Sequence, residues 1–248
     1  MEHHENRRLC PNSSVLHLRF LAERMSPEIQ IQQGFAIGYP DRALLRSTAS
    51  RPLAVAKRPL RLTTGRHLLL ARNGRGKTTL LKTLARLLPE LEGQFSARGQ
   101  VQYVHEELSF DPELTSRQIF GAFFGNPDRA KATEYADRLE LDTRKPYGKL
   151  SKGNRQKVNL ILAETFAAGG KPCILLLDEP FSGIDYHARQ AIDSIWNENT
   201  ANILRLVCVH PDEPTLQAQS ALLIRDGEIE HVEVNGELDW LETRKCLN

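Results

Sequence analysis

The sequence predicts an α/β fold with a mostly parallel central sheet, and three observations support this prediction. Near-continuous apolar runs, typical of strands buried on both faces, lie at 66–71, 174–177 and 204–209. Segments with helical spacing alternate with them, at 78–88, 157–167 and 188–198. Such alternation is typical of a parallel sheet flanked by helices. In addition, the first run leads into a glycine-rich loop that opens a helix.

The first half of the chain holds three further segments that favour strands. They lie at 15–20, where the pattern indicates an edge strand, at 29–39 and at 101–104. Residues 39–42 (Tyr-Pro-Asp-Arg) predict a turn, and residues 43–58 are irregular because Ser, Thr and Pro interrupt them. Pro89 is expected to end the helix that begins at Thr78.

The second half contains helices and a terminal hairpin. Residues 114–145 carry helical patterns, with Pro127 and Asp128 as a start signal inside them. Gly169 and Gly170 end the helix at 157–167. The last two predicted strands, around an Asp-Gly turn, lie at 221–224 and 228–234. No internal repeat interrupts this order.

Composition excludes several classes of protein. The 248 residues can bury a substantial core as one large domain or two small ones. Collagen-like, low-complexity and disulfide-scaffold compositions are absent. No run approaches 18 apolar residues, and the N-terminal sequence lacks the apolar stretch of a signal peptide. The four cysteines have no metal-ligand spacing, so cytosolic thiols are expected and a structural zinc is not.

Charge is unevenly distributed along the chain. The net charge is only +2, yet residues 42–89 contain twelve Lys or Arg and no Asp or Glu. The rest of the chain is correspondingly acidic. This asymmetry indicates either an anionic ligand at the basic stretch or a solvated basic face.

The glycine-rich loop has the pattern of a phosphate-binding loop. Its residues are Ala71, Arg72, Asn73, Gly74, Arg75, Gly76, Lys77, Thr78 and Thr79. Glycines let successive backbone N–H groups surround a phosphate, and the helix N-terminus adds a favourable dipole. Lys77 is expected to reach the β- and γ-phosphates, and Thr78 to coordinate Mg²⁺. Ala71 replaces the first glycine of the consensus, which raises the question of strain at the loop entrance.

Two acids follow the apolar run at 174–177. Neighbouring residues of a strand point in opposite directions, so Asp178 and Glu179 can have different roles. Asp178 is predicted to hold magnesium, and Glu179 to polarise the attacking water. Alone, this segment could be an ordinary strand-end turn. Its position 101 residues after Lys77 favours a catalytic pair.

Together these motifs resemble the ATP-binding cassette (ABC) family of ATPases. The resemblance covers roughly residues 29–230, and its most specific segment is LSKGNRQK at 150–157, similar to the family signature LSGGQ. It implies a P-loop NTPase cassette with an antiparallel β subdomain and a small helical subdomain. In the family the signature faces the γ-phosphate bound by the other subunit, and Ser151 and Gly153 match that role. The wording is similar to cassettes of ABC-2-type exporters.

Four further positions match the family pattern to different degrees. Asp185 follows the carboxylate pair at the place of the D-loop, a subunit contact. His210 matches the histidine that senses the γ-phosphate. Tyr39 resembles the aromatic residue that stacks on adenine, although it lies farther from the phosphate loop than expected. Glu106 stands where the family has glutamine, and a carboxylate there could ligate Mg²⁺ at the cost of added negative charge.

The resemblance implies Mg²⁺-dependent ATP hydrolysis between two cassettes, in a homo- or heterodimer. It also implies a membrane-spanning permease as partner, and a cytoplasmic location at the membrane face through that partner. The wording of the signature favours export. The implied domains are an N-terminal extension at 1–28, the cassette at 29–235 with its helical subdomain at about 108–158, and a tail at 236–248.

Two alternatives to a transporter subunit remain open. A soluble ABC ATPase acting on nucleic acid or ribosomes is the first, and the basic stretch keeps it open. Against it, only 74 positions separate Lys77 from Ser151, too few for the long coiled coils of DNA-repair relatives, so nucleic acid is not expected as a partner. A non-hydrolysing regulatory cassette is disfavoured because Lys77, Asp178, Glu179 and His210 are all present.

Overall fold

The computed structural model describes residues 26–39, 52–209 and 217–233. The strands are β1 (Glu28–Ile31), β2 (Ala36–Ile37), β3 (Ala54–Val55), β4 (Leu60–Leu62), β5 (Gly65–Ala71), β6 (Phe95–Arg98), β7 (Gln100–Val104), β8 (Cys173–Asp178), β9 (Ile203–Cys208), β10 (Ser220–Arg225) and β11 (Glu228–Glu233). The helices are α2 (Lys77–Leu84), α3 (Ser116–Phe123), α4 (Asn126–Arg138), α5 (Lys152–Ala167) and α6 (Tyr186–Glu198), with a 3-10 turn at Tyr147–Lys149. The predicted strand at 15–20 lies outside the described residues, as does most of the turn at 39–42.

An eight-stranded sheet forms the centre, in the order β2-β3-β11-β10-β5-β9-β8-β7. From β10 to β7 every neighbouring pair is parallel. The β10–β11 hairpin is antiparallel, as its Asp-Gly turn predicted. A separate antiparallel sheet has the order β4-β1-β6. The predicted α/β class with a mostly parallel sheet and antiparallel strands is confirmed.

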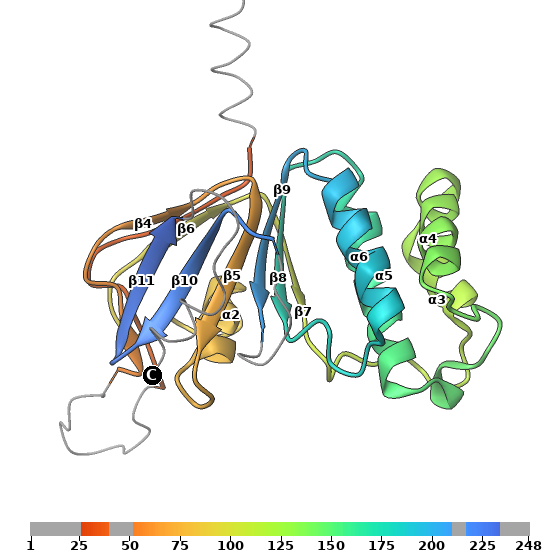
Figure 1. Cartoon of the computed structure of the whole chain (residues 1–248), viewed down its shortest axis with the longest axis horizontal. Coiled ribbons are helices and arrows are strands. Elements are labelled where there is room, and N and C mark those ends of the chain that lie inside the picture. The colour runs from red at the N-terminus through yellow and green to blue at the C-terminus, as the bar shows by residue number, and fades with distance from the viewer. Residues whose placement is uncertain (1–25, 40–51, 210–216, 234–248) are drawn as a thin grey trace, which may run out of the picture.

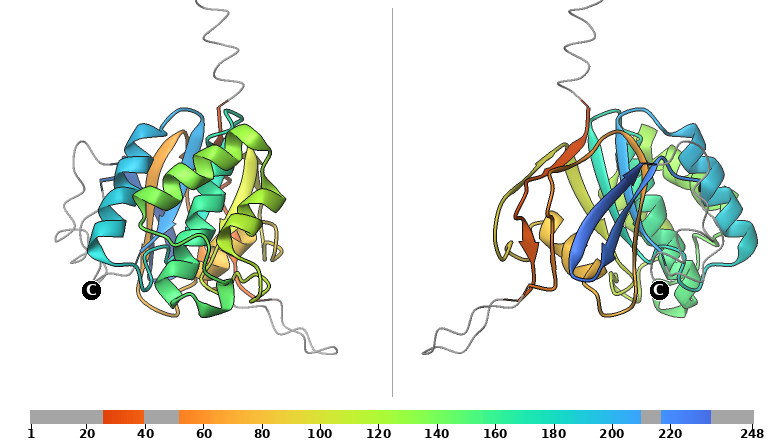
Figure 2. Two further views of the ribbon diagram at one scale, coloured as in Figure 1. Left: turned by 90° about the vertical axis from the view of Figure 1, so that its right-hand side faces the viewer. Right: turned by 60° about the vertical axis from the view of Figure 1, so that its left-hand side comes forward.

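The molecule is layered on both faces of the central sheet (Figure 1). Helix α2 packs with the small sheet on one face, where Leu80 and Leu81 share a core with Ile29 and Phe95. Helices α5 and α6 cover the opposite face, and α3 and α4 lie beyond them (Figure 2). No helix within the described ranges is both long and apolar enough to cross a bilayer.

Several element boundaries differ from those predicted. Helix α2 ends at Leu84 rather than at residue 88, since Arg86 adopts a left-handed conformation (φ 58°) that a helix cannot continue. Helix α5 begins at Lys152, five residues before the predicted start, because Ser151 caps it. The helical pattern at 114–145 divides into α3 and α4, where Phe124 has extended backbone angles.

The basic stretch at 42–89 is partly compensated within the fold. Lys57 pairs with Glu228 at 2.6 Å, Arg66 pairs with Asp193 at 2.5 Å, and Arg61 pairs with Glu28. The acidic partners lie outside the stretch, in β1, α6 and β11. Part of the charge asymmetry in the sequence therefore serves contacts between distant segments rather than an external anion.

Candidate functional site

The carboxyl ends of β5, β7, β8 and β9 meet at one edge of the parallel sheet. The core on the α2 side of the sheet contains alternate residues of β5, β8 and β9, which are Leu69, Ala71, Ile174, Leu176, Leu204, Leu206 and Cys208. Asp178 continues the alternation of Ile174 and Leu176, so its side chain faces the same side as α2. The carboxyl edge of such a sheet is where open α/β folds bind ligands.

The phosphate loop connects β5 to α2. Gly74 and Gly76 adopt left-handed φ values of 76° and 102°, which residues with a Cβ rarely tolerate. The Lys77 Nζ donates to the Ala71 carbonyl (3.1 Å) and to Asn73 Oδ1 (3.2 Å), so it lies across the loop. Ala71 is the last residue of β5, fully buried and in regular register with Ile224. The replacement of the consensus glycine is therefore accommodated without backbone strain.

A pocket of about 260 Å³ opens beside this loop. Its lining residues come from α2, β7, β8 and the segments after these strands; they are Thr78, Lys82, Tyr103, His105, Glu106, Glu107, Asp178 and Glu179. The structure thus brings the predicted metal residues Thr78, Asp178 and Glu106 together with the predicted base Glu179. Hydroxyl and carboxylate oxygens are the ligands that Mg²⁺ prefers, so this lining fits the ion.

Tyr103 is a site residue that the sequence analysis missed. Its hydroxyl donates to Asp178 Oδ2 at 3.0 Å, and its ring stacks on His105. Burial, together with the negative charge of Asp178, raises the pKa of Tyr103, which keeps the phenol protonated as a donor. The only signal in the sequence was its position in the predicted strand at 101–104. That signal was not sufficient, because the pairing of this strand with β8, which brings Tyr103 to Asp178, cannot be predicted from the sequence.

Glu179 lies where β8 ends in a sharp turn. Its φ of 50° is left-handed, and its backbone N–H donates to the Cys208 carbonyl at 3.2 Å. Strained backbone of this kind is common at functional sites. Glu179 also borders a second pocket, of about 270 Å³, whose lining includes Ser182 and Val209. His210 follows Val209 directly but lies outside the described residues.

Ser151, Gly153 and Asp185 form a cluster of their own. The Ser151 hydroxyl caps α5 by accepting from the Asn154 N–H at 3.2 Å. A Cβ on Gly153 would lie 2.0 Å from the Gly183 carbonyl oxygen, so this close contact requires glycine. Asp185 caps α6 and lies 3.2 Å from Lys157 Nζ; its hydrogen bond from a backbone N–H and this lysine hold its pKa below the usual range. None of the three lines the pocket at Thr78.

The two remaining predicted residues lie near the phosphate loop in different ways. The Tyr39 hydroxyl is 3.3 Å from Thr79 Oγ1, and the residue as a whole is 62% exposed, so an aromatic side chain is available beside the loop. Glu106 lies at the pocket but also contacts the cluster at α5. Its Oε2 is 2.6 Å from Lys152 Nζ and accepts from the Ser182 hydroxyl at 3.2 Å.

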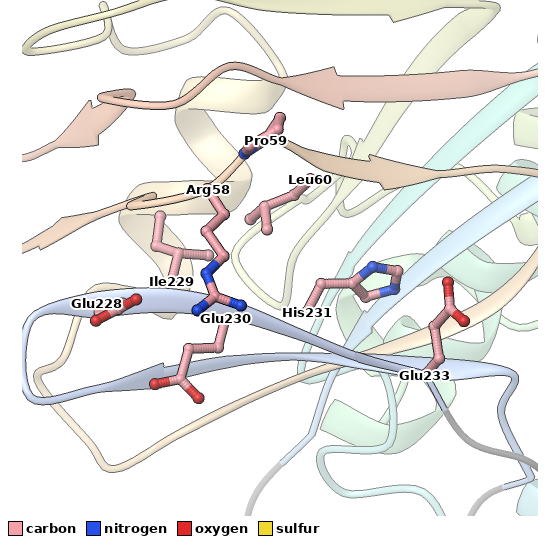
Figure 3. Close-up of a pocket in the computed structure, with 8 residues that line it drawn as sticks. All are labelled: Arg58, Pro59, Leu60, Glu228, Ile229, Glu230, His231 and Glu233. Carbon is pink, nitrogen blue, oxygen red and sulfur yellow. The ribbon is translucent and has the colours of Figure 1, made fainter.

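A larger hollow, of about 600 Å³, lies between the start of β4 and strand β11 (Figure 3). It is lined by mixed charges, with Arg58 facing a strand that carries Glu228, Glu230 and Glu233. No residue of the phosphate loop lines it. Its chemistry therefore does not add to the argument for a nucleotide site.

Comparison with known proteins agrees with this geometry. The sequence profile of the family described as "ABC transporter" matches residues 60–182. An uncharacterized ABC transporter ATP-binding protein of Methanocaldococcus jannaschii is 38% identical over 47% of this chain and 46% of its own length. An aliphatic sulfonates import ATP-binding protein of Paracoccus denitrificans is 31% identical over 66% of this chain and 68% of its own.

The fold has solved counterparts. The structure of an ATP-binding subunit of an ABC transporter superposes with a TM-score of 0.63 at 19% identity, over 90% of this chain and 94% of that one. This likeness supports the fold, and the sequence matches, which span about half of the first relative, support the family. The chain belongs to the ABC transporter family, among its ATP-binding proteins.

Proposed function

We propose that this chain is the ATP-hydrolysing subunit of an ABC transporter and that it powers a separate membrane-spanning partner. The observation that carries the proposal is the single sheet edge where Lys77 and Thr78 lie beside Asp178 and Glu179. A phosphate-binding loop, oxygen ligands and a carboxylate base are the parts that phosphoryl transfer to water requires. The related ATP-binding proteins support the same reading.

Each residue then has a role set by its position. The backbone of 72–76 and the Lys77 ammonium bind the phosphates, and Tyr39 stacks on adenine. Thr78 and Asp178 hold Mg²⁺, which when bound offsets phosphate charge. Glu179 accepts a proton from the attacking water. His210 senses the γ-phosphate.

A second cassette completes the site in this proposal. Ser151, Gly153 and Asp185 do not line the pocket at Thr78, and in this proposal they serve the nucleotide bound by another cassette. A head-to-tail homo- or heterodimer would bring the Ser151 cap of one cassette to the phosphates on the other. The dimer would lie at the cytoplasmic face of the membrane through its permease.

The relatives favour the transporter over the nucleic-acid alternative, because they are named as transporter ATP-binding proteins. The export direction stays a prediction from the signature wording, and one relative is named for import. Affinity purification in a gentle detergent tests the partner. Recovery of a multi-span membrane protein supports the proposal, whereas recovery of ribosomes or DNA with no such protein would contradict it.

Lys77→Ala is expected to weaken Mg·ATP binding by about ten- to a hundredfold, because charge-assisted hydrogen bonds contribute about 1.5–3 kcal/mol. Titration of a fluorescent ATP analogue measures the change. Lys149→Ala, which removes an exposed lysine outside the pocket, is the matched control. Equal affinity of the Lys77 variant and the control would refute the phosphate-loop assignment.

Tyr103→Phe is expected to lower ATP turnover by roughly tenfold while leaving the fold intact, because Asp178 loses a hydrogen bond that orients its carboxylate. The phenyl ring keeps its packing on His105. Steady-state phosphate release at varied Mg²⁺ is the measurement, and a higher Mg²⁺ requirement is expected. Tyr135→Phe, whose hydroxyl contacts Asn199 instead, serves as control. An unchanged Mg²⁺ dependence would exclude this role for Tyr103.

A further inference from the structure

Three segments that are far apart in the sequence meet at the Glu106 carboxylate. Glu106 follows β7, Lys152 is the first residue of α5, and Ser182 follows β8. Both partners reach the same oxygen, Oε2, at 2.6 Å from the Lys152 ammonium and 3.2 Å from the Ser182 hydroxyl. The hydrogen bond from Lys152, the positive charge of that lysine and the hydrogen bond from Ser182 lower the pKa of Glu106, which favours the ionised carboxylate.

The contact links two regions with different chemistry. Glu106 lines the pocket that also contains Thr78, Asp178 and Glu179. Lys152 lies between Ser151, which caps α5, and Gly153. Gly153 lies so close to the Gly183 carbonyl that a Cβ would clash with it. The ion pair therefore joins the nucleotide pocket to the start of α5 within one chain.

Stability alone does not account for this pair. The side chains of Lys152 and Glu106 are 63% and 44% exposed, and ion pairs this exposed contribute little to folding. Charge balance does: Glu107, Asp178 and Glu179 already place three acids in the pocket, and a fourth would oppose the phosphates of ATP. Both residues also differ from the family pattern. Glu106 stands where the family has glutamine, and Lys152 stands where the signature LSGGQ has its first glycine.

We propose that Lys152 is a positioning residue that neutralises Glu106 and ties it to α5, so that the two act as one unit in nucleotide binding. This inference rests on the proposed ATPase function. In the unit, Glu106 serves as the link between pocket and helix rather than as a magnesium ligand. Loss of either partner alone changes the net charge that the pocket presents to Mg·ATP. Loss of both partners restores that net charge.

A double-mutant cycle tests the unit through the KM for Mg·ATP. Lys152→Gln leaves an uncompensated acid in the pocket and is expected to raise KM about three- to fivefold at low salt, with kcat less affected. The double variant Glu106→Gln/Lys152→Gln is expected to return KM to near the parent value. Salt of about 0.5 M should shrink the effect of the single variant, because the pair is exposed to solvent. Lys149→Gln is the control for loss of a nearby positive charge.

Additive effects in the double variant would overturn the proposal, since a shared role requires rescue. A second measurement does not depend on nucleotide. A zero-length carbodiimide should join Glu106 to Lys152 as an amide in the parent protein, detected by peptide mass spectrometry; absence of that crosslink would also overturn it. If the crosslink forms but the parent protein neither binds nor hydrolyses ATP, the proposed function is wrong and the contact between Glu106 and Lys152 is still supported. If the parent hydrolyses ATP but the double variant does not recover the parent KM, only the proposed unit is wrong.

Discussion

Glu179→Gln is expected to reduce ATP turnover by at least about a hundredfold while preserving ATP binding, because removal of a general base costs about 10²–10⁴ in rate. The amide keeps the size and most of the polarity of the carboxylate but cannot accept a proton from water. The left-handed backbone at this position and its hydrogen bond to Cys208 fix where the side chain begins, so the substitution is expected to change chemistry rather than geometry.

Two readouts separate catalysis from binding in this variant. Phosphate release gives kcat, and sedimentation with Mg·ATP shows whether a dimer accumulates, as expected when nucleotide closes the pair and is not hydrolysed. Glu107→Gln removes another carboxylate from the lining of the same pocket and is the matched control. If Glu179→Gln turned over ATP at the parent rate, Glu179 would have no role as base. If it failed to bind ATP, the substitution would have damaged the pocket itself.

The part of the site that the sequence predicted best depends on local chain order. A strand, a glycine-rich loop and a helix are consecutive, so Lys77 and Thr78 could be placed before any tertiary contact was known. Asp178 could be placed for a similar reason, since a buried apolar strand ends at it. The structure confirms β5 and β8 close to their predicted bounds, and it confirms the start of α2, which ends four residues earlier than predicted.

What escaped prediction depends on pairing between distant segments. Strands β4 and β6 are short and interrupted by charge, and they form because β1 pairs with both. The polar start of α5 has no apolar periodicity, so its early beginning follows from the Ser151 cap. The contact between Glu106 and Lys152 requires β7 and α5 to converge, which neither segment shows alone.

Glu164→Ala is expected to destabilise the protein by about 3–5 kcal/mol, because it leaves a buried arginine without its counter-charge. Glu164 in α5 and Arg205 in β9 are 4% and 2% exposed, respectively. Their two hydrogen bonds, Nε to Oε1 at 3.0 Å and Nη2 to Oε2 at 2.6 Å, form a bidentate pair. Urea unfolding followed by circular dichroism measures the loss, and Glu198→Ala, which breaks an exposed pair with Arg138, is expected to shift the midpoint little.

The position of this pair also explains why its loss is expected to affect the candidate nucleotide site. Helix α5 carries Ser151 and Lys152 at its other end, and β9 leads to Val209 beside the pocket of Glu179. A replacement of both partners, Glu164→Leu with Arg205→Met, removes the buried charges together and is expected to recover most of the stability. Recovery of stability with impaired ATP turnover would show that the pair also positions α5 against β9. Equal midpoints for Glu164→Ala and the parent would mean that the buried arginine finds another partner.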